Sequence, residues 1–102
     1  MTGNAPVPKD RDGNDVAVGT TVRVLSLSGR WLDEIPEDER ARVLSMVGET
    51  FQVYEIDSYG RPWVMKEWHG IDGHPDVFLI EDVALDADEM LVVRADEHDA
   101  GT

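Results

Sequence analysis

Cysteine is absent from the 102 residues of this chain. Its absence excludes a disulfide framework, a cysteine nucleophile and a thiolate site for zinc or an iron–sulfur cluster. A chain without disulfides suits a reducing compartment. We therefore expect a cytoplasmic protein.

Long apolar runs are also absent. No stretch approaches the roughly 18 consecutive apolar residues that a membrane-spanning helix requires. The N-terminal segment MTGNAPVPKDRDGND lacks the hydrophobic centre of a signal peptide. We expect a soluble, intracellular protein that does not bind a membrane.

Positive charge is scarce, since 9 lysines and arginines stand against 22 aspartates and glutamates, for a net charge of −13. Attraction to phosphate supplies most of the affinity for nucleic acids and anionic membranes, so we expect neither as a partner. Beyond position 80, Arg94 is the only lysine or arginine. The acidic residues there are Glu81, Asp82, Asp86, Asp88, Glu89, Asp96, Glu97 and Asp99. These acidic residues could bind a basic partner. Alternatively, they keep the protein soluble, or they mimic a nucleic-acid backbone.

The two ends of the chain, residues 1–15 and 95–102, are polar, and we expect them to be flexible tails of a domain at 16–94. Within this domain, one segment has a helical pattern. In IPEDERARVLSMVG, residues 35–48, Pro36 suits the first helical position and Gly48 a left-handed C-cap. The three acids after Pro36 favour the first turn. This predicts one helix of about three turns, which must dock to be stable.

The remaining body alternates with a period of two. Asp57 and Gly60 mark a turn, and residues 28–35 and 69–76 are interpreted as loops. The predicted strands are 19–27, 50–56, 61–68, 77–85 and 90–93. Five short strands with one helix between the first and second predict a mostly β fold. Closure into a small barrel would remove the exposed strand edges.

Two segments resemble parts of a known fold. VGTTVRVLSLSG, residues 18–29, is similar to the opening strand and first loop of SH3-like barrels, and MVGETFQVYEIDSYGRPWV, residues 46–64, resembles their central hairpin. The resemblance implies an SH3-like five-stranded barrel over residues 16–94, with a short α-helix inserted between strands 1 and 2. The ALYDY-type stretch of peptide-binding SH3 domains is missing, so binding of proline-rich peptides is not implied. The chain also resembles small bacterial proteins of unknown function that share the pattern MxGExFxVYEID…G…WV.

Two segments contain metal-ligand residue types. Between residues 69 and 76, two imidazoles and two carboxylates would suit zinc, nickel or iron, although their spacing matches no established motif. These candidates are His69, Asp72, His74 and Asp76. DRDGND, residues 10–15, resembles part of a calcium loop, but its glycine is misplaced. We expect no cofactor, and metal or small-ligand binding at His69–Asp76 is the alternative function.

Groups suited to catalysis are few. His69, His74 and His98 are the only side chains that titrate near neutral pH without perturbation. The serines lack a nucleophile-elbow context, and the chain has no glycine-rich phosphate-binding loop. We therefore expect no enzymatic activity.

The aromatic residues Trp31, Tyr59, Trp63 and Trp68 are the remaining candidates for a binding site. Aromatic rings anchor protein interfaces because they bury large areas at low entropic cost. Alternatively, Trp63 and Trp68 fill the core of this small domain. We predict a non-enzymatic interaction or accessory module that binds a basic protein through these four residues. An acidic inhibitor that mimics nucleic acid is a further alternative.

Overall fold

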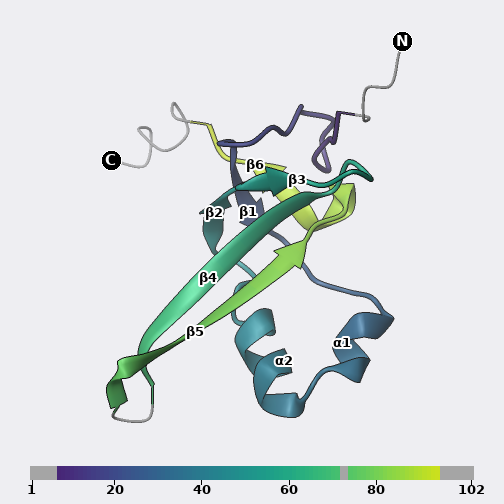
Figure 1. Ribbon diagram of the computed structural model, residues 1–102. Helices are drawn as coiled ribbons and strands as arrows, with labels where there is room; N and C mark the ends of the chain where they lie inside the picture. The colour runs from purple at the N-terminus through teal and green to yellow at the C-terminus, as the bar shows by residue number, and fades with distance from the viewer. Residues whose placement is uncertain (1–6, 72–73, 95–102) are drawn as a thin grey trace.

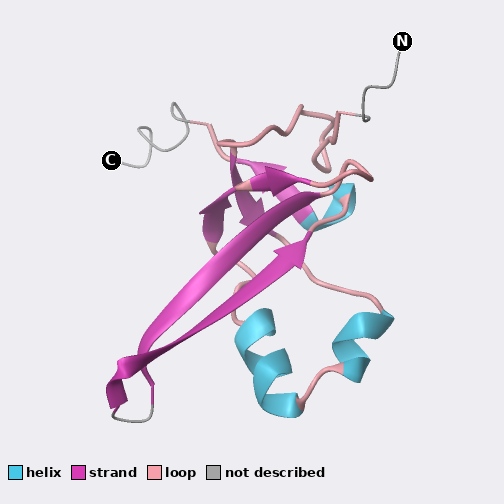
Figure 2. Cartoon of the chain, in the orientation of Figure 1, coloured by secondary structure: helices cyan, strands magenta, loops and turns pink. Residues whose placement is uncertain are grey.

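The computed structural model describes residues 7–71 and 74–94, which form two small antiparallel sheets and two short α-helices (Figures 1 and 2). The strand order is β2-β1-β6 in the first sheet and β3-β4-β5 in the second. Neither sheet closes into a barrel, so the prediction of an SH3-like five-stranded barrel is wrong. Its coarser part, a mostly β fold with a helix, is confirmed.

The first sheet is centred on β1. Its strands are β1 (Thr21–Val24), β2 (Thr50–Gln52) and β6 (Met90–Val92). Val22 and Val24 are fully buried and Arg23 between them is exposed, as alternation along a strand predicts. The strand is shorter than predicted, because after Val24 the chain leaves β2 and β6. The amide of Leu25 then donates to the carbonyl of Glu89 at 2.7 Å.

The second sheet is formed by the segment between β2 and β6. Its strands are β3 (Glu55–Ile56), β4 (Pro62–Ile71) and β5 (His74–Ala84). The predicted single strand 50–56 is divided at Val53 and Tyr54, so that β2 lies in one sheet and β3 in the other. The predicted turn is confirmed, with the Gly60 amide donating to the Asp57 carbonyl at 2.9 Å.

Strands β4 and β5 form a long hairpin whose end lies beyond the rest of the chain, at lower left in Figure 1. The loop predicted at 69–76 is wrong, because both strands continue into it until Ile71 pairs with His74. The pairing register shifts between His69 and Ile71, where Gly70 has a φ of 70° that glycine adopts without strain. Residues 72–73 are Asp-Gly, a strong hairpin signal that the loop interpretation overlooked. These two residues lie outside the described part.

The predicted helix is confirmed in shortened form as α2 (Glu37–Leu44), with Pro36 at the N-cap rather than inside the helix. A second helix, α1 (Arg30–Glu34), occupies a segment predicted as a loop. The Arg40 side chain donates to the carbonyls of Leu32 at 2.7 Å and Ile35 at 3.2 Å. These side-chain bonds between α2 and the end of α1 do not appear in the hydrophobic periodicity from which the loop was predicted. Within residues 7–71 and 74–94, no helix is long and apolar enough to cross a membrane.

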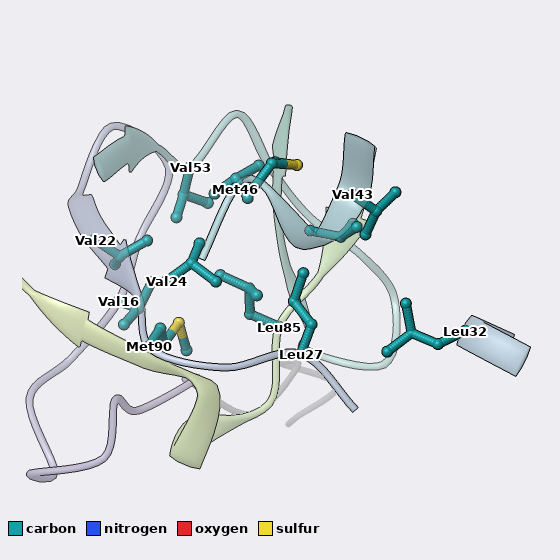
Figure 3. Packing of buried hydrophobic residues seen from close by; sticks show 12 residues of the cluster. Val16, Val22, Val24, Leu27, Leu32, Val43, Met46, Val53, Leu85 and Met90 are labelled. Atoms are coloured by element: carbon teal, nitrogen blue, oxygen red, sulfur yellow. The ribbon is translucent and has the colours of Figure 1, made fainter. Parts of the chain in front are cut away.

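The hydrophobic core lies between the first sheet, the two helices and the base of the β4–β5 hairpin (Figure 3). Figure 3 shows Leu32 of α1 at the margin of this cluster, facing Leu27. The buried hydrophobic residues are Val16, Val22, Val24, Leu27, Leu32, Val43, Met46, Val53, Val64, Val83, Leu85 and Met90. Trp31 and Trp68 are only half-buried and pack against this cluster from outside.

Two carboxylates are buried in the described residues, at Asp10 and Glu89. Asp10 belongs to the segment that the sequence assigns to an N-terminal tail, and its Oδ2 accepts the Val92 amide of β6 at 2.8 Å. This bond ties residues near the start of the chain to the first sheet. The domain limits of 16 and 94 stay a prediction.

Candidate functional site

A groove of about 330 Å³ lies where α1, the start of β4 and the end of β5 meet. It brings together two of the predicted aromatic residues, which lie far apart in the sequence. We call it the Trp31–Trp63 groove; its lining residues are Trp31, Arg61, Trp63, Asp82, Val83 and Ala84.

The Trp63 ring is held by the turn that precedes β4. Its indole Nε1 donates to Oδ2 of Asp57 at 2.9 Å, and Oδ1 of Asp57 accepts the amides of Tyr59 and Arg61, each at 2.9 Å. The hydrogen bonds from the Arg61 amide and the Trp63 indole hold the pKa of the Asp57 carboxyl below its usual value of 3.8. The turn therefore keeps an ionised acceptor in place to orient the indole.

The Trp31 ring is held at the start of α1. Its indole Nε1 donates to the carbonyl of Ser28 at 3.1 Å, which folds the ring back over Gly29. Gly29 has a φ of 126°, and a Cβ atom there would lie 2.7 Å from Cδ1 of the indole. Only glycine therefore allows this ring position without a rearrangement.

Two charged residues line the groove, and only one of them forms an ion pair among the described residues. Arg61 pairs with Asp86, with its Nη2 3.4 Å from Oδ1 of the carboxylate. Asp82 accepts a hydrogen bond from the Tyr54 hydroxyl at 2.8 Å. Within residues 7–71 and 74–94, no lysine, arginine or histidine forms an ion pair with Asp82. The groove therefore has an acidic wall.

The Tyr54–Asp82 contact has a measurable signature. Burial of Tyr54, together with its hydrogen bond to the Asp82 carboxylate and the charge of that carboxylate, raises the pKa of Tyr54 to about 12 from its usual 10.0. We expect Asp82→Asn to lower the pKa of Tyr54 towards 10.0, because an uncharged amide no longer opposes phenolate formation.

Ultraviolet absorbance titration of a Tyr59→Phe background, which leaves Tyr54 as the only tyrosine, measures this pKa directly. Glu67→Gln is the matched control, because Glu67 is acidic and belongs to the same hairpin but does not line the groove. An unchanged Tyr54 pKa in Asp82→Asn would contradict the assigned contact.

Tyr59 and Trp68 do not line the groove. Tyr59 is 83% exposed on the turn before β4. Trp68 lies on the opposite face of β4 from Trp63, where it packs against the core and has the Lys66 Nζ 5.1 Å from its ring centroid. The structure thus brings together Trp31 and Trp63 and separates Tyr59 and Trp68 from them.

Apolar side chains continue along the same face of the hairpin as Trp63. Cross-strand pairing aligns Met65 with Asp82, Glu67 with Ile80 and His69 with Phe78. We call this set, with Trp63 and Ala84, the outer face of the hairpin. Its exposed fractions are 41% for Met65, 47% for Ile80 and 54% for Phe78. The outer face therefore adjoins the groove and exposes three apolar side chains among the polar ones of Asp82, Glu67 and His69.

Sequence reasoning missed the groove residues on β5. Asp82 and Ala84 are adjacent to Trp63 only because Trp63 pairs with Ala84 and Met65 with Asp82. That register depends on where the hairpin turns. The Asp-Gly dipeptide at 72–73 was the signal that would have supplied it.

Of the four predicted metal ligands, His69 alone has its side chain in the described part of the chain. Asp72 lies outside the described residues, as do the side chains of His74 and Asp76. The exposed His69 ring stacks on Phe78 with 5.6 Å between centroids, and its Nε2 is 3.4 Å from Oε1 of Glu67. Among the described side chains, no group of three or more histidines and acids is placed to hold a metal ion. Metal binding at 69–76 stays a prediction.

The calcium-like segment at residues 10–15 has a different local structure. Both oxygens of Asp10 are occupied by N–H donors from within the protein: Oδ1 accepts the amides of Asp12 and Asn14, and Oδ2 accepts the Asn14 side chain and the Val92 amide. The Asp10 carboxylate therefore holds the backbone of residues 12, 14 and 92 in place.

Comparison of the chain with protein-family models, with curated proteins and with solved structures gave no match. The resemblance to SH3-like barrels and to small bacterial proteins therefore has no support from relatives, and the open sheets contradict the barrel.

Proposed function

We propose that this chain is a small non-enzymatic interaction module whose binding surface is the Trp31–Trp63 groove. The observation that carries the proposal is the convergence of two half-buried indoles from α1 and β4 on one groove. Tryptophan is among the residues that contribute most to binding energy at protein interfaces.

Both rings are held before any partner arrives. The Trp31 indole donates to the Ser28 carbonyl and the Trp63 indole to the Asp57 carboxylate. Binding a partner therefore loses little side-chain entropy at these two positions. A groove of about 330 Å³ lies at the small end of the range for ligand pockets. It fits one or two side chains of a partner better than a large cofactor.

The outer face of the hairpin extends the proposed surface. Met65, Ile80 and Phe78 expose apolar area at increasing distance from the groove along the hairpin. Contiguous apolar surface with polar neighbours is typical of protein interaction sites. The acidic wall at Asp82 and the net charge of −13 favour a basic partner.

The proposal is tested by affinity capture from the native host's lysate with quantitative mass spectrometry. We expect Trp63→Ala to reduce capture of the specific partner by roughly tenfold or more, because a central interface tryptophan commonly contributes about 2 kcal/mol. Most of the fold should survive, because Trp63 lies outside the core cluster.

Trp68→Ala is the matched control, because it also removes a half-buried tryptophan from β4 but on the opposite face. We expect it to lower the melting temperature while capture at low temperature persists. Equal capture by Trp63→Ala and the wild type would contradict the proposed surface.

A further inference from the structure

We propose that the partner of this module binds as an extended segment along the edge of β5 and places a lysine or arginine in the Trp31–Trp63 groove, against Asp82. This inference rests on the proposed function and specifies the chemistry of the partner. Its three supports are the charge of Asp82, the chemistry of the two indoles and the unpaired edge of β5.

The charge of Asp82 is the first support. Some other acids of the described part have cations beside them: Asp86 pairs with Arg61, Glu81 with Arg42 and Glu49 with Lys66. Among the described residues, the side-chain partner of Asp82 is the neutral Tyr54 hydroxyl, at 2.8 Å, and no ion pair is formed. The Arg61 guanidinium that shares the groove is already paired with Asp86 at 3.4 Å. A cation entering the groove therefore meets a carboxylate without a cationic partner.

The indole rings are the second support. The N–H groups of Trp31 and Trp63 already donate to Ser28 and Asp57, so the ligand meets ring carbon rather than donors. Indole rings attract ammonium and guanidinium groups through their negative faces. The protein already contains one such contact, where Lys66 Nζ lies 5.1 Å from the Trp68 ring centroid. A partner's cation would repeat this chemistry on the opposite face of β4.

The edge of β5 is the third support, since β5 is the last strand of the order β3-β4-β5. The Leu85 amide donates to the carbonyl of Pro62 in β4, so the backbone groups of Leu85 are directed towards β4. Because successive residues of a strand direct their backbone groups to opposite sides, Ala84 and Asp82 direct theirs away from β4. Within the described residues, neither backbone bonds to an element beyond that edge. An extended segment can pair there by strand addition.

A second copy of this chain fits the edge less well. Each copy has a net charge of −13, and pairing two β5 strands would bring Asp82 and Glu81 of both copies to one interface. Like charges across an interface disfavour association, whereas a basic segment neutralises them. The geometry and charge therefore favour a basic segment from another protein.

Two short peptides test the inference. The first is an acetylated and amidated Val-Thr-Arg-Thr-Val, and the second has citrulline, a neutral isostere, in place of arginine. The three tryptophans give three indole N–H signals in nitrogen-15 correlation spectra. We expect millimolar arginine peptide to shift the signals of Trp31 and Trp63 and to leave Trp68 unmoved, and the citrulline peptide to bind about fivefold or more weakly.

Asp82→Asn should weaken the arginine peptide by about fivefold, because an exposed charge pair contributes up to about 1 kcal/mol. Asparagine still accepts the Tyr54 hydroxyl, so the groove keeps its shape. Asp88→Asn changes the net charge equally at an exposed residue before β6, outside both the groove and the outer face, and should bind like the wild type.

The inference is overturned by equal binding of the two peptides, by wild-type affinity in Asp82→Asn, or by no shift with either peptide. A dimer in sedimentation without peptide, broken by Trp63→Ala, would overturn it by assigning the groove to a second copy. Trp63→Ala could lose partner capture while the two peptides bind equally. This result would keep the proposed function and reject only the proposal that the partner binds through a basic segment. Unchanged capture in Trp63→Ala would instead reject the proposed function.

Discussion

Glu89→Ala is expected to lower the free energy of unfolding by about 3 kcal/mol, because it leaves three partly buried donors without their charged acceptor. Glu89 is only 3% exposed. Its Oε2 accepts the amide of Ser28 at 2.8 Å and the Ser28 hydroxyl at 3.1 Å, and its Oε1 accepts the Asp86 amide at 2.9 Å. One carboxylate thus links the segment after β1 to the turn before β6. Urea unfolding followed by tryptophan fluorescence measures the loss.

Asp88→Ala is the matched control for this result. Asp88 is the adjacent residue and carries the same charge, but its side chain is exposed. We expect a change within about 0.5 kcal/mol for it, as for most surface substitutions. Glu89→Gln should fall between the two, because an amide keeps one acceptor oxygen and replaces the other by a donor. A similar stability for Glu89→Ala and Asp88→Ala would contradict the role of this carboxylate.

Asp10→Ala is expected to lower the free energy of unfolding by about 3 kcal/mol near neutral pH, because four N–H donors lose a charged acceptor. The donors are the amides of Asp12, Asn14 and Val92 and the side chain of Asn14, at 2.8 to 3.1 Å. The residue is 2% exposed, so water does not readily replace the carboxylate. The expected result is a loss of stability from a position before the first strand.

The contribution of Asp10 should depend on pH in a defined direction. Burial raises the pKa of this carboxyl, but hydrogen bonds from Val92 and Asn14, joined by one from Asp12, outweigh burial and hold the pKa below 3.8. Between that lowered pKa and 3.8 the unfolded chain binds more protons than the folded protein. The stabilisation is therefore fully present above pH 3.8 and is lost as the pH falls through the folded pKa.

Urea unfolding of the wild type and Asp10→Ala between about pH 7 and about pH 2 tests both statements. The difference between the two proteins should narrow in acid, while the contribution of Asp57 falls equally in both. Asp12→Ala removes a neighbouring carboxylate that is exposed and should behave like the wild type. A difference that stays constant down to the lowest pH would contradict the lowered pKa of Asp10.

The local parts of the fold were predictable from the sequence. The turn at Asp57–Gly60, the alternation of Val22, Arg23 and Val24, and the helix after Pro36 all follow from neighbours in the chain. That the two sheets stay open was not predictable in this way. Closure depends on how far β4 and β5 run past β3, and that length was underestimated when residues 69–76 were interpreted as a loop.

The candidate site was predictable only in part, for the same reason. Trp31 and Trp63 stood out as large aromatic residues in a small chain, and the structure places both in one groove. Trp68 belongs to the other face of β4, which alternation along that strand already implied. Asp82 and Ala84 have no local signal, because only the cross-strand register places them beside Trp63.

The two sheets differ in how much of the chain must be present before they can form. The second sheet pairs segments that follow one another directly, so β3, β4 and β5 can associate as soon as that stretch has been synthesised. The first sheet pairs Val22 with Val92, across nearly the whole folded part of the chain. Contacts between residues so far apart in the sequence form slowly, because the entropic cost of closing the loop must be met first. The core around β1 is therefore completed only once residue 92 has left the ribosome, after the hairpin that lines the groove is free to form.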